Sequence, residues 1–370
     1  MKKSFFRGRV TRLRETLDHA NFDTVWITQP ENRRYLSGFK AEDGQLTESS
    51  GSLLITKSAS LLVTDSRYVT QAKSESVDFE VITLKNGLVK GLPELLVRLG
   101  TKCLGFEENY LTWELHRELT GRLRKLSHPV RLVTLKGLVE GHREVKDRDE
   151  VKAMEAASNL MSDILARVFM KLKPGLTEKQ IAWQIEGLAR EGGADSLAFP
   201  SIVASGPNSA LPHAVPTDRK IRRKEPITFD VGVRIDGYCC DMTRTLFIGE
   251  PSAKLKTIYK TVRKAQLAAL VDIQPGVDST KPDSTAREII RQAGFGDYFG
   301  HSLGHGVGLA THERPRLGPD KPVKLKEGMV VTVEPGIYIP PLGGVRLEEM
   351  VVIIKSGLRV LTGDDHFYDF

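Results

Sequence analysis

Four acidic residues in the second half of the chain have the order and surroundings expected of metal ligands. They are Asp230, Asp241, Glu334 and Glu348. The first and third each interrupt an apolar run just before a glycine, and a second acid follows each of them. A carboxylate buried in an apolar strand costs several kcal/mol unless a cation neutralises it. Four such carboxylates predict about two divalent ions.

His305 is the fifth candidate ligand. It lies in His301-Ser302-Leu303-Gly304-His305-Gly306-Val307-Gly308, where glycines let the backbone approach a bound group closely. Carboxylate oxygens with one imidazole favour Mn²⁺, with Co²⁺ or Zn²⁺ also compatible. Two such ions would hold a bridging water, lower its pKa and polarise a carbonyl. The predicted chemistry is metal-dependent hydrolysis.

Each of these residues alone also has an ordinary structural interpretation. An aspartate before glycine is often a turn residue, and Glu334 before Pro-Gly fits an exposed strand edge. A single histidine is often a hydrogen-bonded core residue, and Glu348 beside Glu349 fits surface charge. Because the order, the residue types and a duplicated framework would all have to coincide, we favour the metal site.

The duplicated framework consists of two helix pairs that precede the acidic segments. One helical pattern over residues 147–172 ends at a Pro-Gly pair, and a second follows over residues 177–190. The same order recurs over residues 253–273 and 284–292. Such an internal repeat predicts two halves, each a helix pair plus a hairpin, related by a pseudo-twofold axis. The four carboxylates would then converge where the sheets meet.

The first part of the chain alternates β-type runs with helical patterns. Strands are expected at residues 24–27, 52–55, 61–63, 79–82 and 130–133, and helices at 92–99 and 113–126. Asp147 and Glu150 have the spacing of a helix N-cap and its N3 carboxylate. A chain of 370 residues is long for one core. We therefore predict an α/β domain over residues 1–140 and an α+β domain over 141–370.

Composition is that of a folded, soluble protein, with 40% hydrophobic and 27% charged residues. The net charge of +7 is scattered among acidic residues, and its densest run, Arg219 to Lys224, lies in an expected loop. We therefore predict no nucleic-acid partner. No apolar run reaches the roughly 18 residues that span a bilayer, and the N-terminal apolar stretch is too short for an export signal.

Cysteine usage indicates a reducing compartment. The three cysteines are Cys103 and the adjacent pair Cys239 and Cys240, which cannot comfortably bridge each other. No CxxC pair supports a structural zinc, so we interpret the adjacent pair as small packing residues. The expected location is cytoplasmic.

The candidate ligands and their surroundings resemble the pita-bread metallopeptidases, in the aminopeptidase P and prolidase branch. The motifs that carry this resemblance in the second domain are residues 209–214, 241–245, 301–308, 311–313 and 344–348. Residues 32–39 and 65–68 resemble the creatinase-type companion domain, which methionine aminopeptidases lack. The resemblance implies a pita-bread catalytic domain with Asp230, Asp241, His305, Glu334 and Glu348 as metal ligands.

The resemblance also implies roles for individual residues. Glu334 would carry a proton from the bridging water to the leaving nitrogen, and His312 would stabilise the carbonyl oxygen. His213 and His301 would line the substrate cleft, and Arg346 would orient Glu348 and neighbouring carboxylates. For His213 and His301 the alternative is a capped loop histidine or a helix-end core histidine. For Arg346 the alternative is an ordinary surface cation.

The activity implied by the resemblance is that of an Xaa-Pro aminopeptidase. A hydroxide bridging two metal ions would cleave the bond between an N-terminal residue and a penultimate proline. An Xaa-Pro dipeptidase, or prolidase, is the alternative, and the sequence leaves the substrate length open. A non-catalytic binder on the same fold and the metal-free creatinases are disfavoured by the complete ligand set.

Departures from the family pattern are small. Leu347, Glu349 and Cys240 stand where the family often has Ile, Asp and Ser, and none of them removes a ligand. Because relatives pair so that one N-terminal domain borders the other subunit's cleft, we expect a homodimer.

Overall fold

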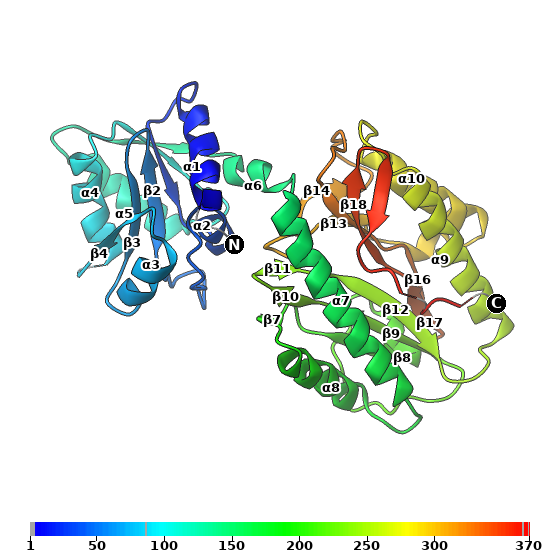
Figure 1. The fold of residues 1–370 in the computed structure, drawn as a ribbon. Helices are drawn as coiled ribbons and strands as arrows, with labels where there is room; N and C mark the ends of the chain where they lie inside the picture. The colour runs from blue at the N-terminus through cyan, green and yellow to red at the C-terminus, as the bar shows by residue number, and fades with distance from the viewer. Residues whose placement is uncertain (1–3, 86, 365, 369) are drawn as a thin grey trace. The chain divides into compact units, whose positions relative to one another are not determined.

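The computed structural model describes residues 4–85, 87–364, 366–368 and 370. These residues form two compact units that divide between His142 and Arg143 (Figure 1). Among the helices of the described residues, none combines the length and the apolar character needed to cross a membrane.

The first unit is built on a six-stranded mixed sheet with the order β4-β3-β2-β1-β5-β6. Its strands are β1 (Thr24–Ile27), β2 (Ser52–Thr56), β3 (Ser60–Thr64), β4 (Glu80–Thr83), β5 (Cys103–Phe106) and β6 (Arg131–Thr134). Its helices are α1 (Ser4–Leu17), α2 (Pro30–Ser37), α3 (Val69–Glu75), α4 (Leu88–Arg98), α5 (Trp113–Leu123) and α6 (Leu138–Arg143), which crosses the division. Strands β1, β2 and β5 are buried along their whole length, as expected of a sheet covered on both faces.

Each strand predicted in this unit is confirmed to within about two residues. Strand β5 and helices α1, α2, α3 and α6 were not predicted. A glycine interrupts β5, and α2 and α3 have only 8 and 7 residues, which is too short for a helical period to show. One face of the sheet packs against α4 and α5, whose leucines join Trp26, Leu54 and Leu104 in one buried cluster.

The second unit contains two helix pairs and four small sheets. The helices are α7 (Arg148–Met170), α8 (Glu178–Glu191), α9 (Ala253–Val271) and α10 (Thr280–Gln292), with 3₁₀ turns η1 (Gly206–Ala210) and η2 (Gly296–Tyr298). The first-half strands are β7 (Ser196–Leu197), β8 (Ile202–Ser205), β9 (Pro226–Val231), β10 (Val233–Ile235), β11 (Tyr238–Cys239) and β12 (Met242–Phe247). The second-half strands are β13 (Gly304–Gly306), β14 (Glu313–Leu317), β15 (Val330–Val333), β16 (Gly336–Ile339), β17 (Gly343–Arg346), β18 (Glu349–Ile354) and β19 (Gly357–Val360).

The sheets of the second unit have the orders β11-β10-β7, β12-β9-β8, β14-β13-β15-β18-β19 and β16-β17. Asp147 caps α7 and forms the predicted capping box with Glu150. Helix α10 begins four residues before its predicted start, because Pro282 lies in the first turn, where a missing N–H costs nothing.

The turn between the helices of each pair is the same in both halves. Gly175 has φ of 95° and donates its N–H to the carbonyl of Ile221, while Gly276 has φ of 86° and donates to Leu325. Two residues after each glycine, an isolated bridge pairs the chain with the same neighbouring segment. The predicted repeat of helix pairs is therefore confirmed, and it extends to the hydrogen bonds of the turns between the helices.

The predicted position of the acids inside strands is right only for Asp230, which lies in β9. Asp241 directly precedes β12, Glu334 directly follows β15, and Glu348 lies between β17 and β18. Pro335 has no N–H for a ladder, so the strand ends where Glu334 turns toward the centre of the unit.

Candidate metal centre

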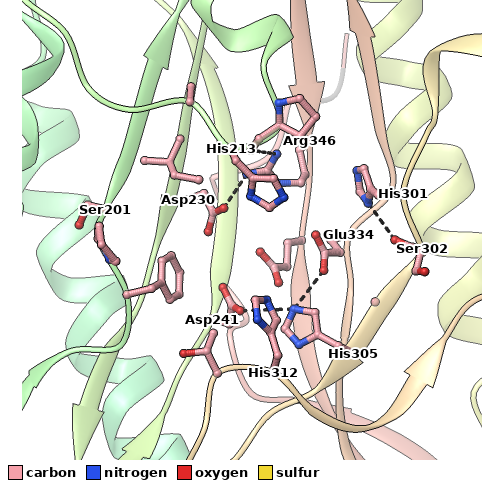
Figure 2. Close-up of a pocket in the computed structure, with 18 of the residues that line it drawn as sticks. Ser201, His213, Asp230, Asp241, His301, Ser302, His305, His312, Glu334 and Arg346 are labelled. Atoms are coloured by element: carbon pink, nitrogen blue, oxygen red, sulfur yellow. Dashed lines mark hydrogen bonds and ion pairs between the residues drawn. The ribbon is translucent and has the colours of Figure 1, made fainter. Parts of the chain in front are cut away.

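One pocket of the second unit, with a volume of about 660 Å³, contains all of the site residues predicted from the sequence. These are His213, Asp230, Asp241, His301, His305, His312, Glu334, Arg346 and Glu348. The first three come from the half that begins with α7, and the others come from the half that begins with α9 (Figure 2). The two halves therefore build one site.

The candidate ligands lie close enough to share metal ions. One ligand atom from each of Asp241, His305 and Glu348 lies within 4.8 Å of the others. His305 Nε2 lies 3.3 Å from Glu334 Oε1 and 3.7 Å from Asp241 Oδ2, between the two carboxylates (Figure 2). Asp230 lines the same pocket.

Threonine hydroxyls from neighbouring elements hold these ligands in place. Thr332 Oγ1 donates to Glu334 Oε1 at 3.1 Å and accepts the backbone N–H of His305 at 3.1 Å. A Cβ on Gly304 would lie 2.0 Å from the carbonyl oxygen of Thr332, so only glycine allows these strands to approach so closely. Thr243 Oγ1 donates to Glu348 Oε2 at 2.7 Å.

The charges of the site fit a pair of divalent cations. Burial, followed by repulsion from neighbouring carboxylates, raises the pKa of Asp241 and Glu348 well above the usual values. Burial likewise raises the pKa of Asp230, although Arg346 opposes this effect. Crowded, buried carboxylates are destabilised as anions unless cations neutralise them. The residues present are therefore suited to hold the metal that the sequence predicts.

Glu334 differs from the other three acids. Burial opposes its ionisation, but the hydrogen bond from His305 and nearby positive charge lower its pKa to about 2. The same contact with Glu334 raises the pKa of His305, against the opposing effect of burial. Glu334 is therefore ionised near neutral pH.

Arg346 supplies a buried cation at the edge of the carboxylate group. Its Nη2 donates to Asp230 Oδ2 at 2.6 Å, and its Nη1 donates to the hydroxyl oxygen of Tyr338 at 2.9 Å. Its Nε donates to Thr243 Oγ1 at 3.1 Å. Among the described residues, Arg346 thus bonds to Asp230 directly and is linked to Glu348 through the Thr243 hydroxyl.

His301 and His312 are neutral in this environment. Burial lowers the pKa of both, and positive charge on His305 lowers that of His312 further. His301 Nδ1 lies 2.8 Å from the carbonyl oxygen of Ser302, which can only accept, so Nδ1 carries the proton. His301 Nε2 then accepts from the Tyr338 hydroxyl at 2.9 Å. The ring of His312 meets that of His305 edge-on, with centroids 4.3 Å apart.

Three residues at this site were not predicted from the sequence. Tyr338 bonds to both His301 and Arg346, and the only sequence signal for it is a tyrosine on a strand close after Glu334. Glu313 lines the pocket beside His312 but received no predicted role. Arg316 also lines the pocket and donates from Nε to Ser302 Oγ at 2.6 Å, and no sequence pattern indicated it.

Family comparisons match both units of the chain. Residues 152–355 match the model of metallopeptidase family M24, and residues 9–145 match that of the creatinase/prolidase N-terminal domain. A protein named Xaa-Pro dipeptidase from Pyrococcus horikoshii is 35% identical over 355 residues, which is 96% of this chain and 96% of that protein.

Solved structures give the same result. An Xaa-Pro dipeptidase from Bacillus anthracis has a TM-score of 0.89 and 36% identity, covering 97% of this chain and 98% of that one. An X-Pro aminopeptidase from Thermotoga maritima has a TM-score of 0.84 and 36% identity, with the same coverage. The resemblance predicted from the sequence is therefore confirmed: the chain belongs to metallopeptidase family M24 and carries a creatinase/prolidase N-terminal domain before its catalytic domain.

Proposed function

We propose that the protein is a metal-dependent exopeptidase for Xaa-Pro substrates, with dipeptides as the favoured class. The observation that carries the proposal is a single pocket that combines five metal-type ligands with His213, His301 and His312 in a chain of this family. Relatives named Xaa-Pro dipeptidase, at 35% and 36% identity over 96% of this chain, support the dipeptide class. Aminopeptidase activity is the second candidate, supported by the X-Pro aminopeptidase structure at 36% identity.

Two divalent ions would be held by Asp230, Asp241, His305, Glu334 and Glu348. Hard oxygen ligands with one imidazole favour Mn²⁺, and the same set accommodates Co²⁺ or Zn²⁺. When bound, the ions would supply an acidified water as nucleophile and polarise the scissile carbonyl.

The proton transfers are assigned to Glu334. With a pKa of about 2 its carboxylate is ionised at neutral pH and can accept a proton from the attacking water. The nitrogen of any scissile peptide bond must receive a proton as the bond breaks. In an Xaa-Pro bond this is the ring nitrogen of proline, which carries no N–H. Glu334 would deliver that proton, and the neutral His312 would donate a hydrogen bond to the oxygen on which negative charge develops.

Arg316 gives a physical reason for a preference for dipeptides. In an Xaa-Pro dipeptide the C-terminal carboxylate lies one residue beyond the scissile bond. Arg316 lines the pocket, and its Nε donates to Ser302 Oγ at 2.6 Å. Arginine binds carboxylates with two parallel hydrogen bonds, so this cation would favour a substrate that ends at proline.

A homodimer and a cytoplasmic location belong to the same proposal. Symmetric pairing is the commonest state of soluble oligomers and is implied by the resemblance drawn from the sequence. The three cysteines are unpaired and buried, which fits a reducing compartment. Sedimentation and cell fractionation would test the two points.

The activity is tested with metal-free protein to which Mn²⁺ is added. Its substrates are an Xaa-Pro dipeptide, an Xaa-Pro-Xaa tripeptide and an Xaa-Ala dipeptide, and Glu334→Ala is the inactive control. Metal-dependent cleavage of the Xaa-Pro dipeptide alone is expected. Cleavage of the tripeptide would establish the aminopeptidase, and no metal-dependent cleavage of any of the three would refute the proposal.

A further inference from the structure

We propose that Glu313 is a positioning residue, which holds the loop of residues 307–312 so that His312 faces the metal pocket. The inference rests on the proposed function, in which His312 stabilises the carbonyl oxygen. Glu313 would act through His312 rather than touch the substrate, because its carboxylate is already bonded to other groups of the protein.

The loop is closed at its base by strand pairing. Gly306 in β13 pairs with Glu313 in β14, with a register shift between His305 and Gly306. The loop therefore leaves the sheet one residue after a candidate metal ligand, His305, and returns to it directly after His312. Any change in the path of these six residues would move the His312 ring relative to His305.

The side chain of Glu313 folds back into this loop. Its Oε1 accepts the backbone N–H of Ala310 at 2.9 Å. A Cβ on Gly308 would lie 2.6 Å from Glu313 Oε2, so the carboxylate occupies the space that a side chain at this position would need. Thr311 Oγ1 donates to the carbonyl of Ala198 at 3.2 Å and holds the outer side of the loop.

Two buried cations fix the carboxylate from the other side. Arg143 Nη2 donates to Glu313 Oε1, and Lys146 Nζ lies 3.3 Å from Oε2. The side chains of Arg143, Lys146 and Glu313 are only 4%, 1% and 7% exposed. Burial opposes ionisation of Glu313, yet Lys146 and Arg143 hold its pKa below the usual value. The carboxylate is therefore an ionised anchor between the loop and the segment that precedes α7.

The consequence concerns the neighbouring residue. His312 is bonded in sequence to Glu313, and its ring packs edge-on against His305 at 4.3 Å between centroids. A displacement of about 1 Å in a catalytic group can cost roughly 100-fold in rate. Loss of the Glu313 charge would release the loop from Arg143 and Lys146 and displace His312, while leaving every candidate metal ligand in place.

The test is a double-mutant cycle with Glu313→Gln, His312→Ala and the double variant, assayed on an Xaa-Pro dipeptide. Glu313→Gln is expected to lower kcat by about 10- to 100-fold with little change in KM or in Mn²⁺ affinity. In the His312→Ala background the same substitution is expected to cost less than about 2-fold. An equal loss in both backgrounds, or a loss explained by weaker Mn²⁺ binding, would overturn the proposal.

A matched control removes a different ion pair of the same unit. Asp272 pairs with Lys281 at 2.8 Å, and neither residue lines the pocket. Asp272→Asn should leave kcat unchanged, whereas a loss as large as that of Glu313→Gln would show a general effect of destabilisation. If Glu313→Gln does not fold, Lys146→Met removes one of the two cations and should lower kcat in the same direction by a smaller factor.

The imidazole signals of His312 in NMR spectra of the metal-free protein separate this inference from the proposed function. These signals should shift in Glu313→Gln and stay in place in Asp272→Asn, whether or not any peptide is cleaved. If the wild-type protein cleaves no Xaa-Pro peptide but the signals shift, the proposed function fails and the positioning role stands. Unmoved signals would overturn the positioning role alone.

Discussion

Arg346 Nη2 donates to Asp230 Oδ2 at 2.6 Å, which joins strands β17 and β9 across 116 residues of sequence. Both side chains are largely buried, with exposures of 4% and 15%. Asp230 lies in a site with three other acidic candidate ligands, and Arg346 is the cation bonded to it in the described structure.

Replacement of Arg346 should therefore affect stability most in the absence of metal. Arg346→Met leaves Asp230 buried without its cation and should destabilise the metal-free second unit by about 3 kcal/mol. Added Mn²⁺ should reduce this deficit, because the ions would take over part of the neutralisation. Thermal unfolding with and without Mn²⁺ measures the effect, and Arg346→Lys, which keeps the charge, should lose less. A deficit that Mn²⁺ does not change would contradict the prediction.

Glu334→Gln should lower kcat by about 100- to 10,000-fold, because an amide cannot carry the proton from water to the leaving nitrogen. Glu334 is also a candidate ligand, so the metal content of the variant must be measured by mass spectrometry. A variant that holds the wild-type amount of Mn²⁺ and keeps its kcat would remove the proton-transfer role. Asp272→Asn serves again as the control for loss of a carboxylate elsewhere in the unit.

Arg316→Met should raise KM for an Xaa-Pro dipeptide by roughly 10-fold or more, since a charge-assisted bond to the substrate carboxylate is lost. The same substitution should leave KM nearly unchanged for the dipeptide amide, which has no carboxylate. The comparison of the two substrates isolates the contact from general damage to the pocket. Equal effects on acid and amide would exclude Arg316 as the carboxylate partner.

Metal uptake should release protons and weaken as pH falls. Burial and neighbouring carboxylates raise the pKa of Asp241 and Glu348, so these groups bind protons at pH values where free carboxylates do not. A cation must displace those protons before it binds. Titration calorimetry in buffers of different ionisation enthalpy measures the proton count. No proton release at mildly acidic pH, and an affinity for Mn²⁺ that does not change with pH, would contradict this prediction.

Glu107 predicts a pH dependence of stability in the first unit. Burial raises its pKa to about 7 from an ordinary 4.5, although it accepts the N–H groups of Thr28 and Gln29 and the amide of Asn32. Between these pH values the folded chain binds more protons than the unfolded chain. The free energy of unfolding should therefore fall as pH rises through this window, by an amount on the order of 3 kcal/mol.

Glu107→Gln is the matched variant, because it keeps an oxygen acceptor at the start of α2 and removes the titration. From about pH 4.5 to 7, the free energy of unfolding of this variant should lack the fall with pH that the wild type shows. Denaturant unfolding of the first unit across this range gives the comparison. Parallel curves for the two proteins would show that Glu107 is ionised throughout.

The sequence alone predicted the features that depend on near neighbours in the chain. The capping box of Asp147 and Glu150 joins residues three apart. The helices of each pair show the regular spacing of apolar side chains that predicts a helix. Acids and a histidine in apolar, glycine-rich surroundings indicated the residues that now line one pocket. Strand β5 and the four short or polar helices α1, α2, α3 and α6 carry weaker local signals, and these were missed.

Only the tertiary structure decided which side chains meet. Arg346 bonds to Asp230 rather than directly to Glu348, Tyr338 bonds to His301, and Arg143 anchors Glu313 across 170 residues. Three of the four acids lie at strand ends, where the backbone turns their side chains inward. Such contacts depend on the path of the whole chain, so no regular spacing of residues in the sequence predicts them. Hydrophobic periodicity therefore predicted the elements, whereas packing of the two halves determined the polar contacts of the site.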